Sequence, residues 1–432
     1  MPPIYTFVTS EPLESPLRRF VALQDQTSLI LGPRRIPPIP CPKGNTEKTI
    51  SILTSNGFNQ IEIQDYIKAC QSLKPDVVIG MSDDVGLPKP AAKRAMTMQD
   101  RTMRWTRLIV ESSDGHVSPN LNSDKPASTP SSTYRPSFFA PILPLPRESQ
   151  FSYLEYLEQD LRDAISGLAI CDPVIVADLP KGLRDLPRLS MNQLRSPHQI
   201  LENVFYGIDL LTVPFINSST DAGIALDFHF PVENLAHPEL EGFYSARPMA
   251  IDMWSPSHAT DLAPLRIGCT CYTCANHHRA YIQHLLVAKE MLGWVLLQLH
   301  NLHVLDQFFE GIRQSIAGGT FDSARAAFSR FYLHEFPEGT GQGPRYVSPG
   351  GASSENALST YYSMLITFID CEATNASLLH LEQPERTPWH TRHSKVANRY
   401  RCSTFTNSSS VTCTALTKVL RKDHILIAQS IH

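Results

Sequence analysis

Strand-like and helix-like segments alternate along the first part of this chain, and this alternation constrains the fold more than any other feature. Short strand-like pieces separated by breakers cover residues 28–53, and a helical pattern follows at 63–76. A buried-type strand at 77–84 and a long helix rich in Arg and Lys at 91–111 come next. Because parallel βα units produce this order, the sequence predicts an α/β protein built on a parallel sheet.

The alternation resumes after residue 150, and no internal repeat is visible. The expected helix at 195–207 opens with Ser196 as a cap-like residue and a proline in its first turn. The elements expected in this half are a helix at 152–165, a short strand at 166–172, the helix at 195–207, an apolar strand at 208–215, a hairpin strand at 223–230, and helices at 276–299, 304–316 and 321–332.

The strongest chemical signal is a group of three cysteines within six residues, Cys269, Cys271 and Cys274. They cannot pair among themselves without strain and a leftover thiol, but three thiolates can converge on one tetrahedral metal. Soft sulfur ligands at this spacing favour zinc over the alternative of three buried core cysteines. A closed site with a histidine as fourth ligand is structural rather than catalytic. Spacing alone leaves five histidines open for that place: His277, His278, His284, His300 and His303.

Composition excludes several classes of protein. Hydrophobic residues make up 42% and charged residues 19% of the 432, which supports a sizeable core and excludes a wholly disordered chain. A net charge of −4 excludes nucleic-acid binding through bulk positive charge, although not through a local basic patch. Nine cysteines are too few for a disulfide scaffold. Without an apolar run of about 18 residues or a secretory or mitochondrial leader pattern, we expect a cytoplasmic protein with no integral membrane segment.

The segment CTCYTCANHHRAYIQHLLVAKEMLGWVLLQLHN, residues 269–301, strongly resembles the zinc segment of the tRNA-guanine transglycosylases. In that family the zinc ligands are the three cysteines and the histidine of the later His-Asn pair. The resemblance therefore assigns one structural Zn²⁺ to Cys269, Cys271, Cys274 and His300. Other segments match the family in order over roughly residues 15–345: TSNGF at 54–58, SGLA at 166–169, GIDLLTVPF at 207–215 and TGQGPR at 340–345.

The resemblance implies a (β/α)8 TIM-type barrel with an inserted zinc-binding subdomain. Because the matching part begins near residue 15, the expectation extends to a barrel that is incomplete at its N-terminus. Five parts are expected: an N-terminal βα part of the barrel at 1–111, a Ser/Pro-rich insertion without a core of its own at 112–149, the remaining barrel part at 150–262, the zinc-binding subdomain with the C-terminal helices at 263–345, and a weakly ordered tail at 346–432.

The family exchanges a purine base in tRNA with two carboxylates. One is the nucleophile that forms a covalent ribosyl intermediate, and the other moves protons on the bases. Matched residue by residue, the nucleophile position holds Thr212 and the second acid position holds Thr54. A threonine hydroxyl carries no charge near pH 7 and cannot stabilise an oxocarbenium-like centre. We therefore expect no catalytic residue in this chain, as in the non-catalytic accessory branch of the family.

That branch implies a heterodimer with a catalytic paralogue, which exchanges guanine for queuine at the wobble position of tRNAs with GUN anticodons. The implied partners are the catalytic subunit and tRNA, and peripheral association with the mitochondrial outer membrane is a further expectation from the family. Two alternatives remain. One is an active transglycosylase with a rearranged carboxylate, for which Asp209 and Asp83 are the candidates. The other is a zinc-containing RNA-binding adaptor without a transferase partner.

Several other residues have a structural and a functional interpretation. Asp83 and Asp84 end a predicted strand, where barrel active sites gather residues, although solvated acids or helix caps are the commoner outcome. Basic residues on the 91–111 helix could contact RNA phosphates, although such a run is more often a solvated face: Lys93, Arg94, Arg101, Arg104 and Arg107. Apolar residues in the zinc segment are more simply core packing than a dimer contact: Tyr281, Leu285, Met291, Leu292 and Leu296.

Overall fold

The structure, a computed structural model, describes residues 16–20, 27–34, 41–54, 57–84, 90–113, 134–232, 246–339 and 341. The expected tail at 346–432 and most of the TGQGPR motif lie outside the described residues. Within the described ranges, no helix has both the length and the apolar character needed to cross a membrane.

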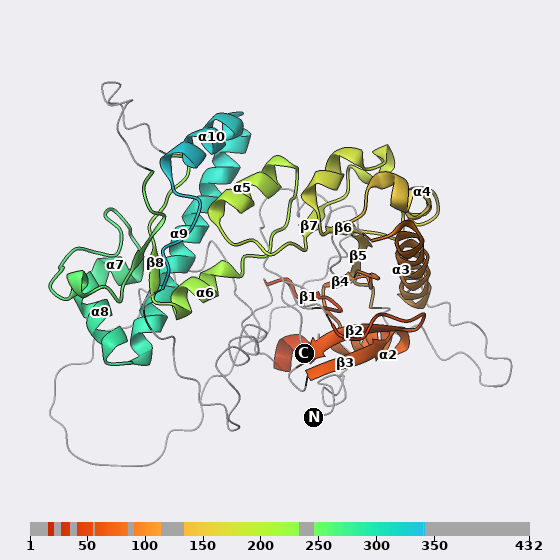
Figure 1. Ribbon diagram of the computed structural model, residues 1–432, viewed down its shortest axis with the longest axis horizontal. Coiled ribbons are helices and arrows are strands. Elements are labelled where there is room, and N and C mark those ends of the chain that lie inside the picture. The colour runs from red at the N-terminus through yellow and green to blue at the C-terminus, as the bar shows by residue number, and fades with distance from the viewer. Residues whose placement is uncertain are drawn as a thin grey trace, which may run out of the picture. The chain divides into compact units, whose positions relative to one another are not determined.

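A parallel sheet of five strands organises the first half of the chain, in the order β1-β4-β5-β6-β7 (Figure 1). The strands are β1 (Ile30–Leu31), β4 (Val77–Ile79), β5 (Ser137–Ile142), β6 (Gly167–Ile170) and β7 (Arg188–Ser190). Every pairing between them is parallel, which confirms the predicted βα units. A further parallel bridge joins Leu189 to Leu210 next to β7. The result is a curled half-barrel, and the described strands do not close it into the full expected barrel.

The predicted insertion at 112–149 is wrong for its C-terminal part. Strand β5 lies inside that range, yet it is the central strand of the sheet, and its residues Phe139 and Ala140 are fully buried. The Ser- and Pro-rich composition around it concealed a short apolar strand, because a buried parallel strand has no alternating pattern. Residues 114–133 of the expected insertion lie outside the described part of the chain.

The helices predicted in this half are present as α2 (Ile63–Leu73), α3 (Ala92–Ser113), α4 (Phe151–Gln159) and α5 (Pro197–Phe205). Helix α2 turns one apolar face inward, and Lys74 ends it in a left-handed conformation with φ 47°. From that face the Tyr66 hydroxyl group lies within hydrogen-bonding distance of the carbonyl oxygens of Leu31 and Ile79, at 3.2 and 2.7 Å. This side chain therefore bridges the ends of β1 and β4.

A separate antiparallel hairpin consists of β2 (Thr49–Thr54) and β3 (Gly57–Glu62). The sequence predicts the first strand but not the second, which is largely exposed. Gly57, with φ 98°, provides the left-handed backbone that opens β3. The hairpin places Thr54 at its turn, opposite Gly57.

The second half of the described chain is mainly helical. It comprises α6 (Phe215–Asp221), the antiparallel pair β8 (Ile224–Leu226) and β9 (Ala250–Asp252), α7 (Tyr272–Asn276), α8 (Arg279–Val287), α9 (Met291–Ala317) and α10 (Phe321–Phe331). Shorter elements of the chain are α1 (Pro16–Phe20) and the 3-10 turns η2 (Arg147–Gln150), η3 (Pro173–Asp178), η4 (Lys181–Leu183) and η6 (Pro256–His258).

Two predicted boundaries differ from the structure in this half. The single helix expected at 276–299 is broken between α8 and α9, where Lys289 adopts a left-handed conformation with φ 59°. The separate helix expected at 304–316 is instead continuous with α9, because no glycine or proline interrupts the chain between them. The apolar segment 208–215 forms only the bridge at Leu210 before α6 begins.

Helix α9 connects two apolar cores. Its N-terminal half contributes Trp294 and Leu297 to a small core with Ile282 and Met253. Its C-terminal half contributes Phe308 and neighbouring residues to the main core. The residue expected to be the fourth metal ligand, His300, lies on α9 between these two parts.

Candidate metal centre

The three cysteines lie on the turn that leads into α7. Gly268 turns the backbone with φ 78°, and the amide of Cys269 donates to the Arg266 carbonyl at 3.2 Å. Cys271 is the N-cap of α7, where its sulfur accepts a hydrogen bond from the amide of Cys274 at 3.3 Å. This local turn brings all three sulfur atoms to one side of the chain.

His300 on α9 completes the group. Its Nδ1 lies 3.7, 3.5 and 3.3 Å from the sulfur atoms of Cys269, Cys271 and Cys274, and the four atoms all lie within 4.8 Å of one another. In a tetrahedral site, ligand atoms that lie about 2.1 to 2.3 Å from the ion are separated from one another by about the distances seen between Nδ1 and these sulfur atoms. The group could therefore hold a metal ion, and it is the one such cluster of three or more ligands within the described residues.

The other candidate histidines near the cysteines have different contacts. His303 Nε2 lies 3.3 Å from the Thr270 hydroxyl, and His277 stacks on the Tyr281 ring. His278 caps α8, where its Nδ1 accepts from the amide of Tyr281 at 3.1 Å. The choice of His300, which spacing left open and the family resemblance made, agrees with this geometry.

The second nitrogen of His300 is fixed by strand β8. His300 is fully buried, and its Nε2 lies 2.8 Å from the carbonyl oxygen of Leu226. A carbonyl can only accept, so Nε2 carries a proton and donates, and Nδ1 faces the sulfur atoms. This is the arrangement in which a histidine binds a metal ion.

The next residue, Asn301, attaches α9 to the same strand. Its side-chain oxygen accepts from the amide of Leu226 at 2.9 Å, and its side-chain nitrogen donates to the Ile224 carbonyl and the Thr220 hydroxyl, both at 3.0 Å. Sequence reasoning did not assign this residue a role, although the His-Asn pair was visible. Two consecutive side chains thus connect the metal centre to β8.

Electrostatics at the cluster suit a cation. Hydrogen bonds from Cys271 and Cys274 lower the pKa of the Cys269 thiol, whereas hydrogen bonds with Cys269 and Cys271 raise the pKa of the Cys274 thiol. Burial lowers the pKa of His300, but hydrogen bonds to Cys269 and Cys271 outweigh it and raise the pKa to about 9. Negative charge therefore falls first on the Cys269 sulfur, and a divalent cation would favour further thiolates.

The two positions that match the family's carboxylates hold hydroxyls with local partners. Thr54 donates to the Gly57 carbonyl at 2.9 Å and accepts from the Asn59 side chain at 2.7 Å. Thr212 is buried, and its hydroxyl lies 3.4 Å from the Asn192 carbonyl. These contacts are those of uncharged side chains that stabilise turns and neighbouring backbone.

Asp209 lies three residues before Thr212 but in a different environment. Its side chain is exposed, and its carboxylate accepts a hydrogen bond from the backbone amide of Arg188 at 2.9 Å. This contact joins the 208–213 segment to the start of β7. Thr212, in contrast, is buried, as expected for residues on opposite faces of an extended segment.

Asp83 is neither a solvated acid nor a helix cap, which corrects the sequence interpretation. It is fully buried, and Arg94 binds both of its carboxylate oxygens at 2.7 and 2.9 Å. Arg101 adds a contact of 3.1 Å and the Asn45 side chain one of 2.6 Å. Both partners on α3 are arginines that the sequence placed on a solvated or RNA-binding face.

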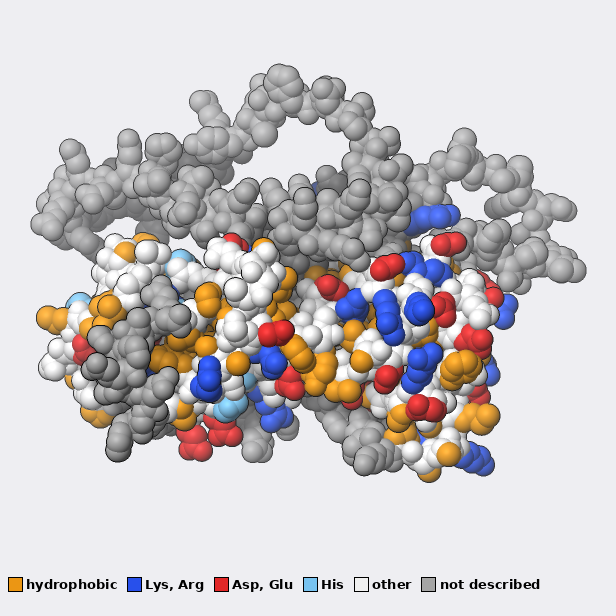
Figure 2. All heavy atoms as spheres, turned by 90° about the horizontal axis from the view of Figure 1, so that it is seen from above, with side chains coloured by type: hydrophobic (Ala, Val, Ile, Leu, Met, Phe, Trp, Pro, Cys, Tyr) orange, Lys and Arg blue, Asp and Glu red, His pale blue; other side chains and the backbone are white. Residues whose placement is uncertain are grey.

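The remaining arginines of that run also have partners within the chain. Arg101 and Arg104 bind the two oxygens of Glu47 at 2.8 and 2.6 Å, and Arg107 binds Glu111 at 2.7 Å. Figure 2 shows basic and acidic side chains interspersed on its right-hand side, the side on which α3 lies in Figure 1. The basic run therefore balances nearby acids, which does not favour the RNA interpretation.

The apolar residues of the zinc segment divide into two groups. Leu285 and Leu296 are buried in the small core, as predicted. Met291 and Leu292 are instead about half exposed. With two further residues they form what we call the α9 stripe, on one side of the helix: Met291, Leu292, Val295 and Leu299, with exposed fractions of 51, 46, 50 and 45%. Such a row of exposed apolar residues is typical of an interaction surface.

Comparison with known proteins identifies the family of this chain. The family model described as queuine tRNA-ribosyltransferase matches residues 11–334. The chain is 35% identical over 336 residues to queuine tRNA-ribosyltransferase accessory subunit 2 of Schizosaccharomyces pombe, which covers 77% of this chain and 70% of that protein. It is 28% identical over 296 residues to the protein of the same name from Anopheles gambiae, covering 67% of this chain and 65% of the relative. The chain therefore belongs to the queuine tRNA-ribosyltransferase family.

Proposed function

We propose that this chain is the non-catalytic subunit of a heterodimeric queuine tRNA-ribosyltransferase. In this role it supports the exchange of guanine for queuine at the wobble position of tRNAs with GUN anticodons. The observation that carries the proposal is the pair Thr54 and Thr212 at the positions of the family's two carboxylates. The names of the relatives, which are accessory subunits, support the same role.

Loss of the carboxylates removes the chemistry of base exchange. A carboxylate can attack the ribose carbon and balance the positive charge that develops there, whereas a neutral hydroxyl needs a base first. Removing one such group costs several orders of magnitude in rate. The acids that could substitute are engaged, because Asp209 binds the Arg188 amide and Asp83 binds Arg94. This weighs against an active transglycosylase with a rearranged carboxylate.

The metal in this proposal is one structural Zn²⁺ per chain. Three thiolates and a neutral imidazole form a donor set that favours zinc, and four protein ligands leave no open position for water or substrate. Cys269, Cys271, Cys274 and His300 would hold the ion. Its contribution is stability, because the four ligands come from the turn before α7 and from α9.

The catalytic paralogue is the partner assigned to the α9 stripe. Exposure of four half-exposed apolar side chains on one helix to water is unfavourable, and burying the remaining half of each in an interface contributes roughly 1 kcal/mol. The stripe lies on α9, the same helix that carries His300, so the metal centre would fix the position of this surface. The heterodimer as a whole is the species that binds tRNA.

We assign the complex to the cytoplasm, with peripheral association at the mitochondrial outer membrane as the finer proposal. The cysteines of the described residues are all free, which suits a reducing compartment. The membrane association rests on the family resemblance, and cell fractionation tests it directly.

Co-purification tests the partnership. A tagged full-length chain is expressed together with the catalytic subunit from the same organism, and the purified material is analysed by size-exclusion chromatography with light scattering. We expect a 1:1 complex. A zinc-loaded chain that never binds the catalytic subunit but binds RNA would instead support the adaptor alternative and refute the heterodimer.

A further inference from the structure

Helix α9 carries an acidic residue without a partner, Asp306, beyond the C-terminal end of the α9 stripe. Its Oδ1 atom is buried and has no hydrogen-bond partner. None of the ion pairs formed by the described residues includes this side chain. Because a buried polar atom without a partner destabilises the fold that contains it, the position of Asp306 requires an explanation.

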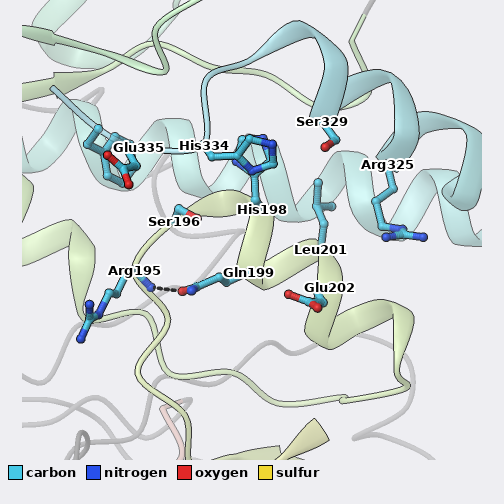
Figure 3. A pocket seen from close by; sticks show the side chains of 11 residues that line it. Arg195, Ser196, His198, Gln199, Leu201, Glu202, Arg325, Ser329, His334 and Glu335 are labelled. Atoms are coloured by element: carbon cyan, nitrogen blue, oxygen red, sulfur yellow. Dashed lines mark hydrogen bonds between the residues drawn. The ribbon is translucent and has the colours of Figure 1, made fainter. Parts of the chain in front are cut away.

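Acids that line the largest pocket of the described residues differ from Asp306 in their access to water. Glu202 and Glu335 line this pocket of about 720 Å³ between α5 and α10, and both residues are exposed (Figure 3). Water satisfies an exposed carboxylate, so these two side chains need no partner within the protein. For Asp306 that solution is closed, since its Oδ1 is out of contact with solvent.

The two basic residues that act on Asp306 lie on α9 and are engaged with other groups. Arg313 binds one carboxylate oxygen of Glu310 through two nitrogens, at 2.7 and 3.0 Å. His303 Nε2 lies 3.3 Å from the Thr270 hydroxyl. Burial raises the pKa of Asp306 to about 6, although His303 and Arg313 act in the opposite direction. The chain itself therefore provides too little positive charge at this carboxylate.

Asp306 continues the line of the α9 stripe. Steps of three, four, three and four residues connect Leu292, Val295, Leu299, Leu302 and Asp306. This spacing keeps side chains on one face of an α-helix, and it is the spacing along which two helices pack against each other. Asp306 lies about 10 Å beyond Leu299 along the helix axis, which is about two turns. A partner that covers the stripe and extends two turns further therefore meets Asp306.

Exposure falls along this line toward its C-terminal end. The side chains of Val295 and Leu299 are about half exposed, whereas Leu302 is partly buried against the main core. Asp306 has intermediate exposure, and Phe309, three residues later, is buried in the main core. The carboxylate group therefore lies at the inner end of the line. It is within reach of a side chain from a partner, yet it is not fully solvated.

A long cationic side chain suits this position. Arginine and lysine can lay their aliphatic stems along an apolar surface such as the stripe and place the charge at a half-buried carboxylate. A hydrogen bond between two charged groups is stronger than one between neutral groups, and it would give Asp306 the partner that it lacks. A neutral donor, in contrast, would leave the negative charge of the carboxylate uncompensated.

We propose that Asp306 is a specificity residue of the heterodimer and pairs with an arginine or lysine of the catalytic subunit that covers the α9 stripe. The inference rests on the proposed function. A row of apolar residues provides affinity but does not set the direction of the partner along α9. A charged contact at one end of the row sets that direction, and it excludes proteins that place an apolar or acidic residue there.

Isothermal titration calorimetry of the zinc-loaded full-length chain with the catalytic subunit tests this pairing. Asp306→Asn and Asp306→Leu should each weaken binding at least about tenfold, because the cation of the partner loses its carboxylate. The melting temperature of the isolated chain should stay equal or rise in both variants, since each removes a carboxylate without a partner. A residue that only supported the fold would instead lower the melting temperature when replaced.

The matched control is Glu310→Gln, one turn further along α9, where Arg313 and Gln314 already bind the carboxylate. It removes the same charge and should bind as the wild type does. Equal weakening by this control would indicate long-range attraction and overturn the pairing. Wild-type or tighter binding by both Asp306 variants would overturn it as well. If the wild-type chain itself does not bind the catalytic subunit, the heterodimer is refuted and the pairing with it, which is a distinct result.

Discussion

His300 Nε2 lies 2.8 Å from the carbonyl oxygen of Leu226, so the proposed fourth ligand of the metal centre is also hydrogen-bonded to strand β8. The neighbouring Asn301 accepts from the amide of that same Leu226. Two consecutive residues of α9 therefore bind both backbone groups of one strand residue. The metal centre is thus linked to β8 as well as to its own turn, and the order of the strand should depend on the metal.

Replacement of one sulfur ligand should remove the metal. In Cys274→Ser, the zinc content should fall from one ion per chain to a small fraction, because a hydroxyl is a far weaker zinc ligand than a thiolate. Thermal stability should fall with it. Cys41→Ser is the matched control, since Cys41 lies outside the cluster, and it should keep its zinc. Full zinc content in Cys274→Ser, measured by atomic absorption, would argue against the assigned ligands.

Removal of the metal should loosen β8 as well as the cysteine turn. After treatment with a chelator, hydrogen exchange should speed up in α7 and in Ile224–Leu226, because His300 loses the ion that orients it toward β8. The central strand β5 is the internal control and should exchange as before. Mass spectrometry of peptides measures all three regions. A change confined to α7 would mean that the metal and β8 are not coupled.

Asp83 should be important for stability rather than for catalysis. Asp83→Asn leaves Arg94 and Arg101 without their buried carboxylate, and breaking a buried pair in this way costs about 3–5 kcal/mol of the free energy of unfolding. Urea denaturation measures the loss. Asp65→Asn is the control, since the Asp65 pair with Lys68 is solvent-exposed and should contribute little. An equally small effect of Asp83→Asn would contradict the buried network.

The α9 stripe should control assembly. Val295→Glu should weaken binding to the catalytic subunit about 100-fold or more, because it loses apolar burial and places a charge in the interface. The zinc content and the melting temperature of the isolated chain should not change, since Val295 is half exposed. Ile316→Glu is the matched control, an exposed apolar residue near the other end of α9. Equal binding by both variants, measured by calorimetry, would place the partner elsewhere.

The sequence predicted the features that local pattern determines. Cysteine spacing identified the metal turn, and local helix-like patterns predicted α2, α3, α5 and α10. The sequence pattern could not choose the fourth ligand among the five histidines, because that choice depends on the break at Lys289, which separates α8 from α9. Only the family resemblance made that choice before the structure did.

The features that the sequence missed depend on long-range contacts or on very short segments. Strand β5 lies in a Ser- and Pro-rich region, and β7 has only three residues, too few for a pattern. The partners of Asp83 lie 11 and 18 residues away on α3, so the buried network was not visible in the order of residues.

Guanine exchange into a tRNA with a GUN anticodon tests the central claim most directly. Labelled guanine is offered to this chain alone, to the catalytic paralogue alone, and to an equimolar mixture of the two, and a tRNA with another anticodon serves as the control substrate. The account predicts incorporation only with the mixture, because Thr54 and Thr212 leave this chain without the two carboxylates. Incorporation by this chain alone would contradict it and would make Asp209 and Asp83 the residues to replace next.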